Sequence, residues 1–368
     1  MNDDLSSNLL WIYLLVSLGV ALQVGAANWD IIWHGIVIVE SFFTPPHTVL
    51  YSGVGLSLIA TVAGIICSIR NDGPITRSFS NYHKIPNQLK LIALGCLVEL
   101  FSGQFDNWWH TNFGFDGLLS PPHLMLISGM LLSILGALIG IHLNQSHKRF
   151  KLISELICYG ILWMVLINFV FMFTLPFSEG QYFNFNPSPT TALVLGVTLP
   201  AIVTAIIFYS VQSISFPFRM TFVAGILMTV QSLATIISNI YFEGIFPLYL
   251  LSILIPLSLD MISIYTKNNI KSIHIFSNKE YKRIILSIAI SPFFITFYFP
   301  WSVNMFKAFF GIDLITFESV IIFEQLLWNF VLPILVPISL ISAYIGILIW
   351  KKLHEYPKLT NKFKIIVG

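Results

Sequence analysis

Two short stretches of the sequence contain the same metal-ligating residue types at the same spacing. Each stretch has an Asp, a His four positions later, and a second His thirteen positions after the first. The first set is Asp30, His34 and His47, and the second set is Asp106, His110 and His123. One carboxylate and two imidazoles suit copper, zinc or ferrous iron. Three protein ligands also leave a coordination position open, so the pattern predicts two metal sites with exchangeable or reactive positions.

The two sets belong to a longer direct repeat, in which corresponding residues are 76 positions apart with no gap. Each copy has a hydroxyl residue and two prolines directly before its last His, and a Ser-Gly pair after it. Glu40 and Asp116 precede these helix starts, and we expect each to accept a hydrogen bond from a metal-ligating side chain. Gln23 in the first copy corresponds to Glu99 in the second. Glu99 would lie on the helix face of Asp106, two to three turns deeper, so it is either a proton relay or a protonated acid packed in a bundle.

Helices must bring each set together. Asp30 and His34 are four positions apart and therefore share one face of a helix. The Thr-Pro-Pro sequence starts the next helix, because a hydroxyl can cap it and Pro is tolerated in its first turn. His47 then lies in that first turn, and a short loop folds it back toward the Asp–His pair. The second copy repeats this pattern, so we predict two helical hairpins. The simpler alternative is that these residues are solvated polar helix ends.

The composition limits where such hairpins can exist. The chain has 368 residues, of which 56% are hydrophobic and only 10% are charged. These values exclude a soluble globular domain and a disordered chain, and a net charge of +2 excludes a nucleic-acid-binding protein. The three cysteines are isolated in apolar stretches, which excludes a disulfide scaffold. The chain is therefore expected to be a polytopic membrane protein.

We predict an all-α transmembrane bundle of about ten helices, because a spanning helix needs about 20 predominantly apolar residues. The expected spans are Asn8–Ala27, Thr48–Ile69, Leu91–Phe105, Pro122–Leu143, Leu152–Pro176, Thr191–Ile214, Met220–Tyr241, Phe246–Tyr265, Ile284–Trp301 and Ile321–Trp350. The first and third helices are expected to continue beyond their apolar runs, to Trp33 and Trp109. Residues 1–151 then form a duplicated two-hairpin metal-binding module, and residues 152–368 form six further helices without the motif.

The loop charges predict the orientation of this bundle. With the N-terminus inside, 18 of the 19 basic residues lie in inside loops or in the C-terminal tail, and only Lys307 lies outside. Basic residues are enriched in cytoplasmic loops. We therefore expect a multi-pass protein of the cell membrane with both termini cytoplasmic and both metal sets near the outer face.

The motif resembles that of a known family. Asp-x3-His-x12-His with a Thr-Pro-x-His helix start is similar to the C subunit of the copper membrane monooxygenases, the particulate methane and ammonia monooxygenase family. The resemblance covers residues 28–145, about a third of the chain. It implies copper at both sets, with Asp106 standing where the family has Asn. The last six expected helices are additional to a typical C subunit.

Three classes of function follow from these observations. The resemblance implies a subunit that takes part in O2-dependent oxidation of a small substrate in the lipid bilayer, together with other monooxygenase-type subunits. A metal-ion transporter or metal-handling membrane protein is the second class, and it should have ionisable residues through the membrane depth. Glu99, Glu155, Asp260 and Glu324 are the candidates for that role. The third class is a structural membrane subunit of a larger complex.

Overall fold

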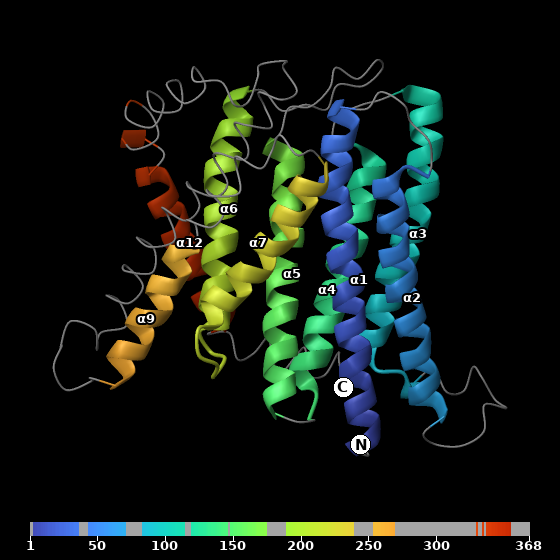
Figure 1. The fold of residues 1–368 in the computed structure, drawn as a ribbon, viewed down its shortest axis with the longest axis horizontal. Helices are drawn as coiled ribbons and strands as arrows, with labels where there is room; N and C mark the ends of the chain where they lie inside the picture. Colours follow the sequence, from blue (N-terminus) through green and yellow to red (C-terminus); the bar gives the residue numbers. More distant parts are fainter. Residues whose placement is uncertain are drawn as a thin grey trace. The chain divides into compact units, whose positions relative to one another are not determined.

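A computed structural model describes most of the chain as helices. The described residues are 3–36, 43–70, 83–114, 119–145, 148–174, 189–238, 253–268, 329, 333–334 and 336–354. Within them there is no strand, which agrees with the predicted all-α class (Figure 1). The helices are α1 (Asp3–Ile36), α2 (Pro45–Arg70), α3 (Asn87–Phe113), α4 (Pro121–Leu143), α5 (Lys148–Thr174), α6 (Pro189–Val211), α7 (Arg219–Ser238), α9 (Leu254–Asn268) and α12 (Val336–His354).

Each of the helices α1 to α6 is long and apolar enough to cross a membrane. This confirms the expectation of a helical membrane protein. Helices α1 and α3 continue beyond their apolar runs to Ile36 and Phe113, slightly further than predicted. Helices α9 and α12 coincide with the C-terminal parts of the eighth and tenth expected spans, and the expected span Ile284–Trp301 lies outside the described residues.

The chain divides into two compact units. The first unit contains α1 to α4, nearly all of α5 and the C-terminal half of α7, whereas the second contains α6, the remainder of α7, α9 and α12. Both Asp–His–His sets belong to the first unit. The predicted division between residues 151 and 152 remains a prediction.

The first four helices form two hairpins that pack side by side. Helix α1 packs against α2 and α3 packs against α4, while α1 also contacts α4 and α2 also contacts α3 (Figure 1). Each helix therefore has two neighbours in the group, and α1 and α3 lie diagonally across it. Because α1 and α3 run in one direction and α2 and α4 return, the end of α1 meets the start of α2, and the end of α3 meets the start of α4.

Glycines allow the two helices of each hairpin to approach closely. A Cβ atom on Gly53 would lie 2.6 Å from the Gly19 carbonyl oxygen, and one on Gly129 would lie 2.9 Å from the Gly95 carbonyl oxygen. These two glycine pairs are 76 positions apart, like the two Asp–His–His sets. A Ser follows four positions after Gly53 and after Gly129, giving the small-xxx-small pattern of closely packed membrane helices.

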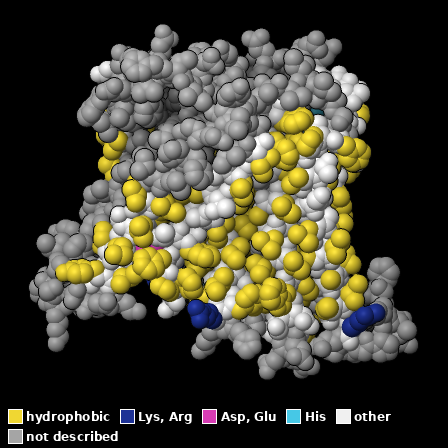
Figure 2. All heavy atoms as spheres, in the orientation of Figure 1, with side chains coloured by type: hydrophobic (Ala, Val, Ile, Leu, Met, Phe, Trp, Pro, Cys, Tyr) yellow, Lys and Arg dark blue, Asp and Glu magenta, His cyan; other side chains and the backbone are white. Residues whose placement is uncertain are grey.

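The outward face of the first unit bears many exposed apolar side chains. On α3, Leu97 and Phe101 are 60% and 67% exposed, whereas Glu99 is almost fully buried. Figure 2 shows a broad apolar surface over the described helices, with the visible Lys and Arg side chains at the lower edge of that face. In water such a surface would be a large unpartnered apolar patch, so its natural surroundings are lipid chains.

Polar contacts in the second unit have structural roles. Both the backbone N–H and the hydroxyl of Thr221 donate to Asp260 Oδ2, at 2.8 Å each. Asp260 therefore caps the first turn of α7 from α9, which gives this mid-helix acid a partner that its sequence context does not reveal. Helices α6 and α12 pack together, and Trp350 donates from its indole N–H to Ser210 at 2.9 Å.

Candidate metal centre

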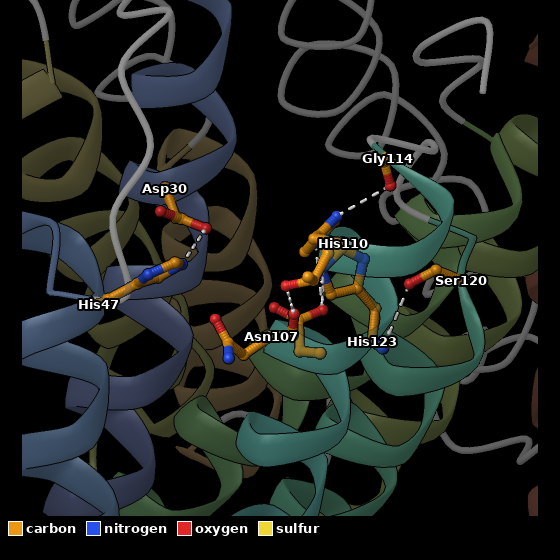
Figure 3. Close-up of polar contacts among 9 residues, drawn as sticks. Asp30, His47, Asn107, His110, Gly114, Ser120 and His123 are labelled. Atoms are coloured by element: carbon orange, nitrogen blue, oxygen red, sulfur yellow. Dashed lines mark hydrogen bonds and ion pairs between the residues drawn. The ribbon is translucent and has the colours of Figure 1, made fainter. Parts of the chain in front are cut away.

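The second set converges at the end of the second hairpin. Asp106 and His110 lie one turn apart near the C-terminal end of α3, and His123 lies in the first turn of α4. Asp106 Oδ1 is 3.3 Å from the Nε2 atoms of both histidines (Figure 3). One ligand atom from each residue lies within 4.8 Å of the other two, which is close enough for all three to bind one ion.

The predicted helix start positions His123. Ser120 is the N-cap of α4, and its side-chain oxygen accepts a hydrogen bond from the His123 backbone N–H at 3.4 Å. Two prolines occupy the first helical positions, as expected where the backbone N–H groups have no intrahelical partner. In the first hairpin, Thr44 Oγ1 accepts from the His47 backbone N–H at 3.3 Å. The same local chemistry therefore fixes the second imidazole in both hairpins.

Gly114 fixes the orientation of His110. Its carbonyl oxygen lies 3.2 Å from His110 Nδ1, and its backbone N–H donates to the His110 carbonyl. A carbonyl oxygen can only accept, so this contact assigns a proton to Nδ1, and in the neutral imidazole the lone pair of Nε2 is then directed at Asp106. Gly114 has φ 71° and ψ −166°, a backbone conformation that only glycine adopts readily.

Asp106 Oδ1 has surroundings that suit a cation. This oxygen is buried and accepts no hydrogen bond from the described residues. It faces the Nε2 atoms of His110 and His123 at the same distance, and in the neutral His110 ring that nitrogen carries a lone pair. Buried acceptors are normally satisfied, and two lone pairs that face each other repel. The residues present therefore fit a positively charged ion among these three atoms.

The first hairpin brings together two members of its set. Asp30 on α1 and His47 on α2 approach to 3.2 Å between Oδ2 and Nε2, and both side chains are 18% exposed (Figure 3). His34 lies one turn after Asp30 on α1, and its side chain lies outside the described atoms. The expected hydrogen-bonding acids Glu40 and Asp116 also lie outside the described residues.

Tyr51 lies between the two sets. Its ring is 6.0 Å from that of His47, and its hydroxyl lies within electrostatic range of both Asp30 and Asp106. The Tyr51 ring packs over Gly103, where a Cβ atom would meet ring carbon Cε1 at 3.3 Å. The repeat places Ile127 at the position of Tyr51 in the second copy. The Asp–His–His motif does not include Tyr51. The only sign of it in the sequence is this departure from the repeat.

A second polar layer lies deeper in the same helices. Ser133 donates to Glu99 Oε1 at 2.9 Å, and Gln23 Nε2 donates to Ser57 at 3.4 Å. The two pairs occupy corresponding positions 76 residues apart. Gln23 and Glu99, which the sequence marks as corresponding polar residues, are therefore found in matching environments.

One further acid–imidazole pair lies in the first unit. Glu155 on α5 is buried and lies 2.9 Å from Nδ1 of His142, at the end of α4 opposite His123. His142 is 70% exposed. Among the described residues, only the second set groups three metal-ligating side chains. Comparison with models of protein families, with curated proteins and with solved structures finds no match for this chain.

Proposed function

We propose that the protein is a membrane metal-binding protein, with copper as the first candidate ion, held by Asp106, His110 and His123. The observation that supports this most directly is Asp106 Oδ1, a buried carboxylate oxygen that lacks a hydrogen bond and lies 3.3 Å from two imidazole nitrogens. A carboxylate with two imidazoles suits copper, zinc or ferrous iron, and the resemblance to the C subunit of copper membrane monooxygenases favours copper.

A second ion is proposed at Asp30, His34 and His47. The contact between Asp30 and His47, together with the matching helix starts, glycine crossings and deeper polar pairs, supports two copies of one ancestral hairpin. Tyr51 would then lie between two occupied sites.

The proposed activity is participation in O2-dependent oxidation of a small substrate, as one subunit of a larger membrane complex. A copper ion at the second set would supply one-electron redox chemistry and an open coordination position. The protein would orient that ion through Gly114 and His110, and the surrounding apolar helices would exclude water. Electrons would come from an external reductant such as a quinol.

Transport or handling of a metal ion is the second candidate function. The buried Glu99 favours it, because ionisable groups inside membrane helices often mark ion or proton pathways. For both functions we propose metal sites near the outer face. The ends of α2, α3 and α5 opposite the second set bear Arg70, Lys90 and Lys151, which supports a cytoplasmic location for those ends.

Metal analysis of the purified protein tests the central proposal. The wild type should bind copper, and His110→Ala combined with His123→Ala should remove one equivalent per chain, because a single remaining ligand cannot hold the ion. His142→Ala is the matched control, since His142 also pairs with a buried acid yet belongs to no set of three. Unchanged metal content in the double variant would contradict the proposal.

Proteoliposomes distinguish the two activities. Reductant-dependent oxygen consumption with a small substrate, lost in the same double variant, is expected for the oxidation. Metal flux across the membrane without oxygen consumption would instead favour the transporter.

A further inference from the structure

A layer of four polar side chains crosses the interior of the two hairpins below the metal sets. Each of the helices α1 to α4 contributes one member, and all four are at most 2% exposed: Gln23, Ser57, Glu99 and Ser133. Glu99 is seven residues before Asp106 on the same helix, which places it about 10 Å deeper along the axis. The layer is thus separate from the residues that would bind metal.

The hydrogen bonds in this layer leave two oxygens unsatisfied. Ser133 donates to Glu99 Oε1, and the amide nitrogen of Gln23 donates to Ser57. The side chains of Gln23 and Glu99 interact across the diagonal between α1 and α3. Gln23 Oε1 and Glu99 Oε2 are both buried, and neither accepts a hydrogen bond from the described residues.

Glu99 Oε2 therefore has no donor among the described residues. In the membrane interior no bulk water is available to either oxygen, and a buried carboxylate charge without a paired cation is costly. A single proton on Glu99 Oε2 would remove that charge. The side chains that interact with Glu99 from α1 and α4 are the Gln23 amide and the Ser133 hydroxyl, and its titratable neighbour on α3 is the Cys96 thiol.

We propose that Glu99 is a proton-binding site in the membrane interior, and that its proton is released when a cation occupies the second set. On release the O–H bond breaks, its electron pair stays on the carboxylate, and the proton passes to the solvent. The link to the metal rests on the proposed function, whereas the proton site itself does not. One unit charge about 10 Å away should change the proton affinity of Glu99 roughly tenfold at an effective dielectric constant of about 20.

Infrared spectroscopy of the purified protein tests the proton site. At neutral pH we expect the C=O stretching band of a protonated carboxyl, absent in Glu99→Gln, which gives the second copy the residue of the first. Glu155→Gln is the control, because Glu155 is buried in the same unit but pairs with His142. If Glu99→Gln removes only bands of an ionised carboxylate, the oxygens are satisfied by a metal ion or water instead, and the proposal is overturned.

A matched pair of serine variants keeps the test decisive if Glu99→Gln fails to fold. Ser133→Ala removes the hydroxyl that donates to Glu99 and should shift the protonated-carboxyl band. Ser57→Ala removes the corresponding hydroxyl of the other copy, which contacts Gln23, and should shift the band less. Equal insensitivity of the band to both changes would contradict the assignment to Glu99.

Proton counting tests the link to the metal. Titration of weakly buffered protein with Zn²⁺ should release more protons from the wild type than from Glu99→Gln at equal metal occupancy. Equal release overturns the coupling and leaves the infrared result standing. Failure of the wild type to bind any metal would contradict the proposed function, again without affecting the infrared assignment.

Discussion

At the scale of single residues, some members of the candidate metal site could be predicted from the sequence and others could not. That Asp106, His110 and His123 lie close together could be predicted, because residues four positions apart share a helix face and the helix start places His123 in the first turn of the next helix. Gly114 and Tyr51 could not. Gly114 acts through its carbonyl and its unusual backbone angles, and Tyr51 reaches α3 only because two separate hairpins pack together. Such contacts depend on tertiary packing, for which local spacing holds no information.

Gly114→Ala should weaken metal binding without removing a ligand. The backbone angles of Gly114 would cost an alanine about 1–3 kcal/mol. The residue that follows α3 would therefore shift, and its carbonyl would no longer hold Nδ1 of His110. Loss of a partner that orients a ligand typically lowers metal affinity about 10–100-fold. Competitive titration with a chelator measures this change. Gly55→Ala is the control, since a Cβ atom there meets nothing within 4 Å and should leave the affinity unchanged.

At the scale of helices, the prolines and apolar runs predicted the hairpins, and the glycines decide how closely their helices pack. The starts of α2 and α4 agree with the Thr-Pro-Pro and Ser-Pro-Pro sequences. The crossings at Gly19–Gly53 and Gly95–Gly129 were not predicted, because glycine is common in membrane helices and its partner depends on how the helices face each other.

Gly129→Ala should destabilise the second hairpin by about 1–3 kcal/mol, the usual cost of overfilling a packed site. Its Cβ atom would lie 2.6 Å from Cγ of Glu99 and 2.9 Å from the carbonyl oxygen of Gly95, so α3 and α4 must separate. Thermal unfolding in detergent measures the effect. Gly55→Ala should instead be neutral or slightly stabilising, because alanine favours a helix and the space is open. Equal melting temperatures for both variants would contradict the packing argument.

At the scale of the whole molecule, composition alone predicted a helical membrane protein, and the spans α1 to α6 agree with it. The grouping into two compact units was less accessible. Helix α5 and the end of α7 belong to the same unit as the hairpins, although their sequences lack the repeat. Apolar surfaces of similar composition can pack in many ways, so hydropathy does not specify which helices associate.

Cysteine labelling in intact cells tests the predicted orientation. With Cys67 replaced by Ala, a membrane-impermeant thiol reagent should label Thr111→Cys from outside, because Thr111 is exposed at the end of α3 that bears His110. Gln145→Cys, exposed just after the opposite end of α4, should react only after permeabilisation. The reverse pattern would place the N-terminus and the basic loops outside.

The number of helices in each copy bears on how such a chain could have arisen. A unit of two spans returns to the side from which it started, so duplicating and fusing it preserves the orientation of both copies. A single ancestral hairpin could therefore have assembled with a second identical molecule, its polar side chains meeting near a twofold axis where Gln23 and Glu99 now interact. Fusion would have ended the requirement for identity. One position could then become an acid while its counterpart stayed an amide, and a tyrosine could replace an aliphatic residue on one side only.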